Sequence, residues 1–70
     1  MKLSARNTFK GKVKHIDNGA VTTEVTIELP GGTEIVSIIG RLSAVDLRLA
    51  TGKDAYAVIN AANVVIGVDS

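Results

Sequence analysis

The residues best suited to chemistry in this sequence are a hydroxyl and a guanidinium placed two positions apart near the N-terminus. Ser4 and Arg6 would share one face of an extended strand, because successive side chains of a strand point to opposite sides. A hydroxyl donor beside a permanent positive charge suits a tetrahedral dianion. Taken alone, the pair is also what an ordinary solvated strand contains, and that explanation is the more common one.

Two further segments offer hydrogen-bond donors to an anion. A short helix is expected to start at Ser43, so the N–H groups near Ala44 and Val45 would lack partners within the helix. The Ser43 side chain is better explained as a cap of those amides. The segment 60–63, Asn-Ala-Ala-Asn, would let a ligand approach backbone N–H groups closely, although a simple turn also accounts for it.

The sequence argues against an enzyme and against a metal bound directly by protein side chains. His15 is the only histidine, and it is expected on the apolar face of a strand, so no Ser/His/Asp set can be assembled. The acidic residues follow no spacing suited to paired acid–base work, and no GxxxxGK phosphate loop is present. With one histidine and no cysteine, a structural zinc is not expected.

The small size of the chain predicts that several copies associate. Seventy residues form one domain, 1–70, and hydrophobic residues make up 46% of it, but only one Phe and one Tyr are present. The core must therefore consist of Val, Ile, Leu and Ala. A chain of this length buries only about 60% of its unfolded surface. Without a disulfide or a metal, association is the remaining source of stability.

The net charge of +1 hides a cluster of cations near the N-terminus. This cluster predicts either an anionic partner or a solvated strand face, and the sequence favours neither. No signal peptide can be recognised, and no run approaches the roughly 20 apolar residues of a membrane helix. A cytoplasmic protein without membrane attachment is expected. The clustered cations are Lys2, Arg6, Lys10, Lys12 and Lys14.

Alternation of apolar and polar residues predicts an all-β fold. Asn18-Gly19 is typical of a tight turn, because both residues tolerate positive φ. The second strand would direct Val21, Val25 and Ile27 inward. Three strands, a short helix and two more strands suit a five-stranded OB-like barrel with its helix between strands 3 and 4. Strands are expected at 2–15, 21–29, 34–39, 56–59 and 64–68, with the helix at 43–49.

Several motifs together resemble those of the molbindins, the Mop-type molybdenum–pterin-binding proteins with a TOBE-like domain. The resemblance begins at Leu3-Ser4-Ala5-Arg6-Asn7 and covers essentially the whole chain. It implies OB-like barrels that assemble as hexamers, as trimers of dimers, with molybdate or tungstate bound where subunits meet. It also implies that the oxyanion is held by Ser4, Ala5, Arg6, Asn60 and Ala61 of one subunit and by Gly40 and Ser43 of its neighbour.

The chain departs from the family pattern at two of these positions. It has Asn60 where many relatives have lysine, and Gly40 where many have threonine. An asparagine amide can still donate a hydrogen bond but adds no charge, and a glycine offers only its backbone. Arg41 could supply a charge beside Gly40.

Storage or buffering of molybdate or tungstate inside the cell is the function that these features predict, with no catalytic cofactor. Two alternatives remain. OB barrels often bind single-stranded nucleic acid, but such proteins usually stack bases on aromatic side chains, which are nearly absent from this sequence. The chain could also be a regulatory module that senses the anion for another protein.

Overall fold

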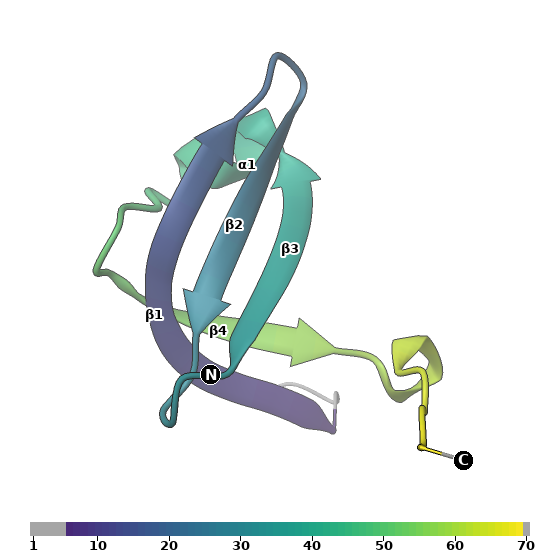
Figure 1. Cartoon of the computed structure of the whole chain (residues 1–70). Helices are drawn as coiled ribbons and strands as arrows, with labels where there is room; N and C mark the ends of the chain where they lie inside the picture. Colours follow the sequence, from purple (N-terminus) through teal and green to yellow (C-terminus); the bar gives the residue numbers. More distant parts are fainter. Residues whose placement is uncertain (1–5, 70) are drawn as a thin grey trace.

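The computed structural model describes residues 6–69 and shows an all-β protein with one antiparallel sheet of four strands. The strands are ordered β3-β2-β1-β4, so β3 and β4 form the two edges. A short helix follows β3 and covers one end of the sheet (Figure 1). The elements are β1 (Asn7–Asn18), β2 (Thr22–Glu28), β3 (Glu34–Gly40), α1 (Arg41–Asp46), β4 (Asp54–Ile59) and the 3-10 helix η1 (Ala61–Asn63).

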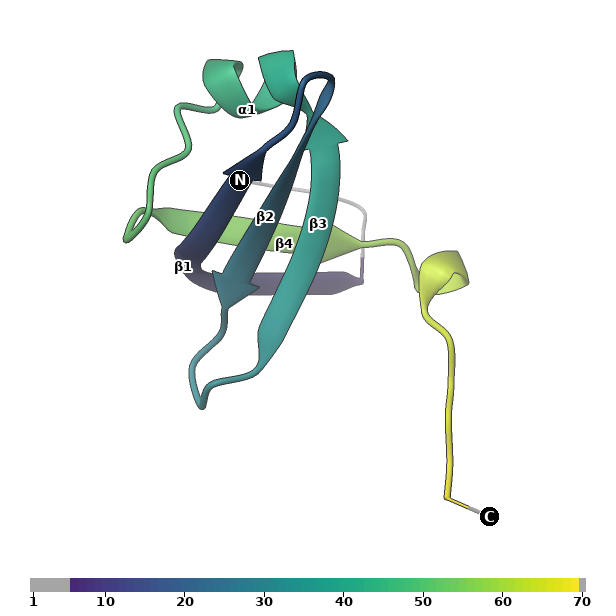
Figure 2. The same cartoon turned by 45° about the horizontal axis from the view of Figure 1, so that its top comes forward.

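The long strand β1 makes the sheet curl, because its two halves pair with different neighbours. Residues 7–12 pair with β4 and residues 12–18 pair with β2, both antiparallel. A bulge lies between Val13 and His15, and bulges increase the local twist. As a result β4 crosses the direction of β2 and β3 (Figures 1 and 2). The curled sheet and the single small helix are consistent with the OB-like fold that the sequence predicts.

The core is small and aliphatic, as the composition predicts. Val13, Val25, Ile27 and Ala57 form the buried cluster inside the curl. Thr23 is also buried, and its hydroxyl donates a hydrogen bond of 3.0 Å to the side-chain oxygen of Asn18. A buried hydroxyl therefore has a partner, which avoids the cost of an unsatisfied polar group.

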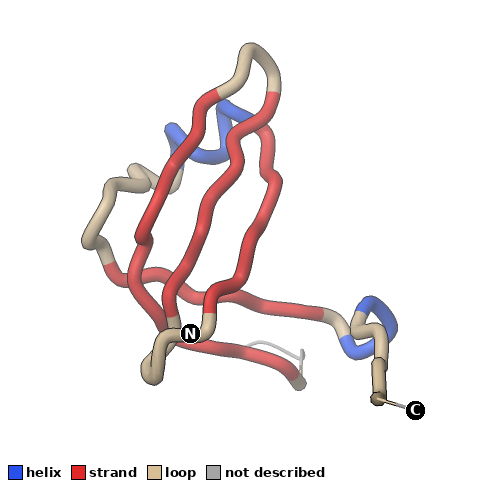
Figure 3. The backbone as a smooth tube through the Cα atoms, viewed as in Figure 1, coloured by secondary structure: helices blue, strands red, loops and turns tan. Residues whose placement is uncertain are grey.

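The prediction of a fifth strand at 64–68 is wrong for this chain. After η1, residues 64–69 have no regular secondary structure, and the two viewing directions both show the segment leading away from the sheet (Figures 1, 2 and 3). An apolar run predicts a segment that tends to pair, but a strand forms only where another strand offers hydrogen-bond partners. Within the described residues, this segment meets no such edge.

The helix lies earlier in the chain than the sequence predicts. It begins at Arg41 with Gly40 as its N-cap, and Ser43 is inside the helix and does not cap it. The Arg41 N–H donates to the carbonyl of Val21 at 3.0 Å, a contact from a distant loop that no local pattern could reveal. The helix ends at Asp46, and Arg48, two residues later, has a positive φ of 53°.

Within residues 6–69 no helix is long and apolar enough to cross a bilayer.

Three smaller predictions also need correction. Neither Asn18 nor Gly19 has a positive φ, and the chain reverses over residues 19–21. Val21 is exposed in that loop instead of facing inward. His15 is exposed as well, because the bulge before it interrupts the alternation of strand faces.

Gly11 lies where β1 passes close to β2, and replacing it should destabilise the fold. A Cβ at this position would lie 2.5 Å from the Glu28 carbonyl oxygen and 2.7 Å from a methyl group of Ile27. Overpacking of this kind costs about 1–3 kcal/mol. We expect Gly11→Ala to lower the free energy of unfolding in that range, measured by denaturant titration.

Gly40→Ala is the matched control for that measurement. Its added methyl group would meet only the Ser43 hydroxyl oxygen, at 3.7 Å, and the backbone at Gly40 suits any residue. Equal losses of stability in the two variants would contradict the close-approach explanation.

Candidate functional site

Arg6 and the Asn60-Ala61 segment lie at the same end of the sheet. Asn7 and Ile59 are the terminal pair of the β1–β4 ladder, so Arg6 and Asn60 directly flank this pair on the two strands. All three predicted residues are exposed, and Ala61 begins the 3-10 helix. Ser4 and Ala5, the other members of this half of the predicted site, lie outside the described residues. The structure thus brings one charged and one amide donor together at this end.

Gly40 and Ser43 lie at the opposite end of β1. Gly40 pairs with Thr22, beside the loop that follows Asn18, the last residue of β1. The 12 residues of β1 separate this end from Arg6, which corresponds to roughly 40 Å of backbone at ~3.3 Å per residue. One chain therefore does not bring the two halves of the predicted site together.

The donors at the start of α1 differ from those the sequence predicts. Because the helix begins at Arg41, Ala44 and Val45 stand where their N–H groups donate to carbonyls of the preceding turn. The Arg41 guanidinium reaches back toward the loop after β1, with Nη1 3.4 Å from the carbonyl oxygen of Gly19. This end of the sheet therefore offers an exposed cation, Arg41, beside Gly40, together with the Ser43 hydroxyl.

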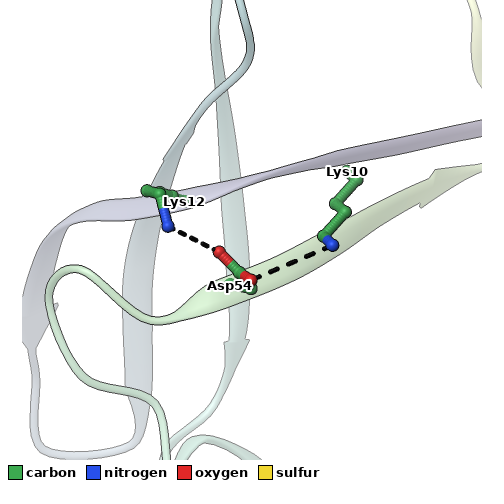
Figure 4. A network of polar contacts seen from close by, with 3 residues as sticks. All are labelled: Lys10, Lys12 and Asp54. Carbon is green, nitrogen blue, oxygen red and sulfur yellow. Dashed lines mark hydrogen bonds and ion pairs between the residues drawn. The ribbon is translucent and has the colours of Figure 1, made fainter.

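Two lysines of the N-terminal basic cluster form ion pairs with the same carboxylate on β4. The Lys12 ammonium donates to Asp54 Oδ1 at 2.7 Å, and Lys10 Nζ lies 3.9 Å from Asp54 Oδ2 (Figure 4). The hydrogen bond from Lys12 holds the pKa of the Asp54 carboxyl below its ordinary value, and the positive charges of Lys12 and Lys10 add to the effect.

The third lysine, Lys14, contacts two carboxylates. It donates a hydrogen bond to Glu34 and lies 3.3 Å from Glu28 Oε2. The hydrogen bonds to Glu34 and Glu28, followed by their charges, raise the pKa of the Lys14 ammonium. Lys10, Lys12 and Lys14 thus behave as a solvated strand face, which was one of the two explanations that the sequence left open.

Arg6 differs from these lysines. Within residues 6–69, no carboxylate lies at ion-pairing distance from its guanidinium, whereas each of the three lysines has one. A guanidinium presents donors in a planar fork that fits the oxygens of an oxyanion. The position next to Asn60 therefore combines a charge, an amide and backbone N–H groups in one exposed area.

The Asp54 ion pairs predict a small dependence of stability on pH. A carboxyl whose pKa is lowered by folding stabilises the fold above its ordinary value of 3.8, and this contribution disappears as the pH falls through the lower folded value. We expect Asp54→Asn to lower the midpoint of thermal unfolding slightly at neutral pH and to match the wild type in strong acid. Surface ion pairs contribute little, so the change should be small.

Asp69→Asn provides the control, because within the described residues no lysine or arginine pairs with Asp69. Its thermal midpoint should follow the wild type at every pH. A difference for Asp54→Asn that persisted unchanged in strong acid, where the carboxyl is protonated in both the folded and the unfolded state, would show that the charge of Asp54 is not the cause.

Comparison with known proteins identifies strong similarities over nearly the whole chain. The sequence profile of the TOBE domain matches residues 3–66. The chain is 45% identical to a "Probable molybdenum-pterin-binding protein" of Haemophilus influenzae, over 99% of this chain and 100% of that protein. The fold matches MopII from Clostridium pasteurianum with a TM-score of 0.92 and 40% identity, over 96% of this chain and 100% of that one.

A third similarity is to a structure with a bound ligand. ModG, described as a cytoplasmic molybdate-binding protein and solved with molybdate bound, matches with a TM-score of 0.95 and 49% identity. The match covers 99% of this chain and 49% of the ModG chain, so this chain corresponds to about half of ModG.

Proposed function

The chain belongs to the TOBE-domain family and, within it, to the Mop-type molybdenum–pterin-binding proteins, and from this premise we propose that it binds molybdate. The observation that carries the proposal is the 49% identity to a protein solved with molybdate bound, together with the matching fold. The relatives are named for binding and not for a reaction, so we propose a binding protein that is not an enzyme and has no catalytic cofactor.

We propose that the anion is held at interfaces of a homo-oligomer. Arg6, Asn60 and Ala61 of one copy would contact it, with Ser4 and Ala5, and Gly40 and Ser43 of a neighbouring copy would complete the site. The separation of these two groups along β1 supports this arrangement, because a single chain presents only one group at each end. A hexamer built as a trimer of dimers is the proposed assembly.

Exposed apolar side chains also support association. Monomeric soluble proteins rarely expose large contiguous apolar patches. In this chain such residues lie on the outer face of β3, on α1 and in the C-terminal segment. They include Val36, Ile38, Leu42, Val45, Val65 and Ile66.

Binding in this site would need no chemical reaction. The N–H, O–H and guanidinium donors would replace the water around the anion, and hydrogen bonds to charged groups contribute about 1.5–3 kcal/mol each. Molybdate, tungstate and sulfate carry the same charge, so selection among them would follow from the size of the cavity. We propose reversible storage or buffering of molybdate or tungstate in the cytoplasm.

Isothermal titration of the protein with each anion tests the proposal. Molybdate or tungstate should bind more tightly than sulfate at equal ionic strength. Native mass spectrometry of the same samples should give the number of anions and the number of chains per assembly. Sulfate binding as tight as molybdate binding would overturn the proposed selectivity, and no heat with either metal anion would overturn the function.

The structure gives little support to nucleic-acid binding. Lys10 and Lys12 both form ion pairs with Asp54, and Lys14 forms ion pairs with Glu28 and Glu34. A basic groove along this face is therefore largely neutralised. A mobility-shift assay with single-stranded DNA should show no complex at physiological salt.

A further inference from the structure

The start of α1 is not fixed by any side chain of its own. Its N-cap is Gly40, no capping side chain donates or accepts there, and the first turn contains no acidic residue. The helix has six residues, of which only Ala44 is buried. Helices this short are held mainly by tertiary contacts. Another part of the chain must therefore hold Gly40 and Ser43, which form half of the proposed anion site.

The loop between β1 and β2, residues 19–21, supplies these contacts. The Arg41 N–H, the first of the helix, donates to the carbonyl of Val21 at 3.0 Å. The Arg41 guanidinium adds a longer contact of 3.4 Å to the carbonyl oxygen of Gly19. Figures 1 and 2 both show this loop beside α1. The carbonyls of the loop thus take the place of a capping side chain.

A buried hydrogen bond at the base of the loop fixes its shape. Asn18 and Thr23 form the last pair of the β1–β2 ladder, and the Thr23 hydroxyl donates to Asn18 Oδ1 at 3.0 Å. Thr23 is fully buried, so losing this partner would leave its hydroxyl unsatisfied. The Gly19 N–H closes the turn by donating to the Thr22 carbonyl at 2.8 Å.

The same residues of β2 also pair with the end of β3 that leads into the helix. Thr22 pairs with Gly40, and Thr23 pairs with Ile39. A change in the conformation of β2 at Thr23 would therefore reach Gly40 by two routes, through the strand pairing and through the loop.

We propose that Thr23 and Asn18 are positioning residues for the anion site. Their hydrogen bond fixes the loop, and the loop holds Gly40 and Ser43 in the one place where an anion can be shared with a neighbouring copy. The inference rests on the proposed function and adds two residues to it. Thr23 acts from inside the sheet and does not touch the anion, because its side chain is shielded from solvent.

Two substitutions of Thr23 separate positioning from ordinary packing. Thr23→Val keeps the shape of the side chain and removes the hydroxyl, whereas Thr23→Ser keeps the hydroxyl and removes the buried methyl group. A residue that only fills the core would lose more stability and more affinity with serine than with valine. A positioning hydroxyl gives the opposite order of affinities.

Isothermal titration with molybdate measures these affinities, with light scattering to establish that the variants keep the mass of the wild type. We expect Thr23→Val to weaken binding by about three- to tenfold, the range that one intramolecular hydrogen bond supports. Thr23→Ser should bind like the wild type, although its free energy of unfolding is lower. Thr26→Val is the control, because Thr26 is buried in the same strand but pairs with His15 and Val36, away from the loop, so its affinity should not change.

Amide hydrogen exchange of Arg41 gives a second measurement that needs no anion. Exchange requires local opening, so the Arg41 N–H should exchange faster in Thr23→Val than in the wild type or in Thr26→Val. Asn18→Ala removes the acceptor at an exposed residue and should reproduce both effects, which keeps the test valid if Thr23→Val folds poorly.

The outcomes distinguish this inference from the proposed function. A wild type that binds molybdate, with Thr23→Val and Asn18→Ala variants that bind it equally well, would overturn the positioning role alone. A greater loss of affinity with Thr23→Ser than with Thr23→Val would overturn it too. If the wild type binds no molybdate, the proposed function fails, and the exchange of the Arg41 amide decides whether the hydrogen bond holds the start of α1.

Discussion

Arg6→Ala is expected to weaken molybdate binding by about 10- to 100-fold. Within the described residues, Arg6 has no carboxylate partner, so its charge is available to an anion. Charged hydrogen bonds contribute about 1.5–3 kcal/mol each, and 1.4 kcal/mol corresponds to a factor of ten in affinity. Isothermal titration at constant ionic strength gives the ratio directly.

Two further variants separate the geometry of Arg6 from its charge. Arg6→Lys keeps the charge but loses the planar fork of donors, so its affinity should lie between those of the wild type and Arg6→Ala. Arg48→Ala removes an exposed arginine outside the proposed site and should leave the titration unchanged. An Arg6→Ala curve that coincides with the wild type would exclude Arg6 from the site.

Val13→Ala is expected to lower the free energy of unfolding by about 2–3 kcal/mol. Val13 is 1% exposed and lies at the centre of the small core, next to the bulge of β1. Removing two buried carbons costs about 0.8 kcal/mol each, and the cavity left behind adds to the loss. In so small a domain this loss is a large share of the total free energy of unfolding.

Denaturant titration at one fixed protein concentration measures this loss, because association makes apparent stability depend on concentration. Val21→Ala is the matched control. Val21 is 78% exposed, so its truncation should change the free energy of unfolding by no more than about 0.5 kcal/mol. Comparable losses in the two variants would mean that Val13 is not part of the core that holds the sheet together.

Much of the fold follows from local patterns in the sequence. Alternation predicts β2 within a few residues, because a half-buried strand must place alternate side chains in the core, and short apolar segments predict β3 and β4 with similar accuracy. The scarcity of aromatic residues likewise predicts an aliphatic core, and the buried cluster contains Val13 and Val25. Motifs such as Ser4-Ala5-Arg6 predict the family, which the similarity to known proteins confirms.

The helix and the turn after β1 were less predictable, because each depends on a contact between distant residues. Ser43 has the right type for a cap, but the Arg41 N–H is already bonded to the Val21 carbonyl, and the helix starts there. The orientation of His15 was equally hard to predict, because it depends on the bulge between Val13 and His15 in the pairing of β1 with β2.

By itself, the sequence determined the residue types, the strand pattern and the family, because these depend on neighbours along the chain. Only the tertiary structure decided that Arg6 and Asn60 share one end of the sheet, while Gly40 and Ser43 lie at the other. It also decided that residues 64–68 remain unpaired, although their composition favours a strand. The physical reason is that strand pairing and site assembly depend on which edges meet in space, and that information is spread over the whole chain.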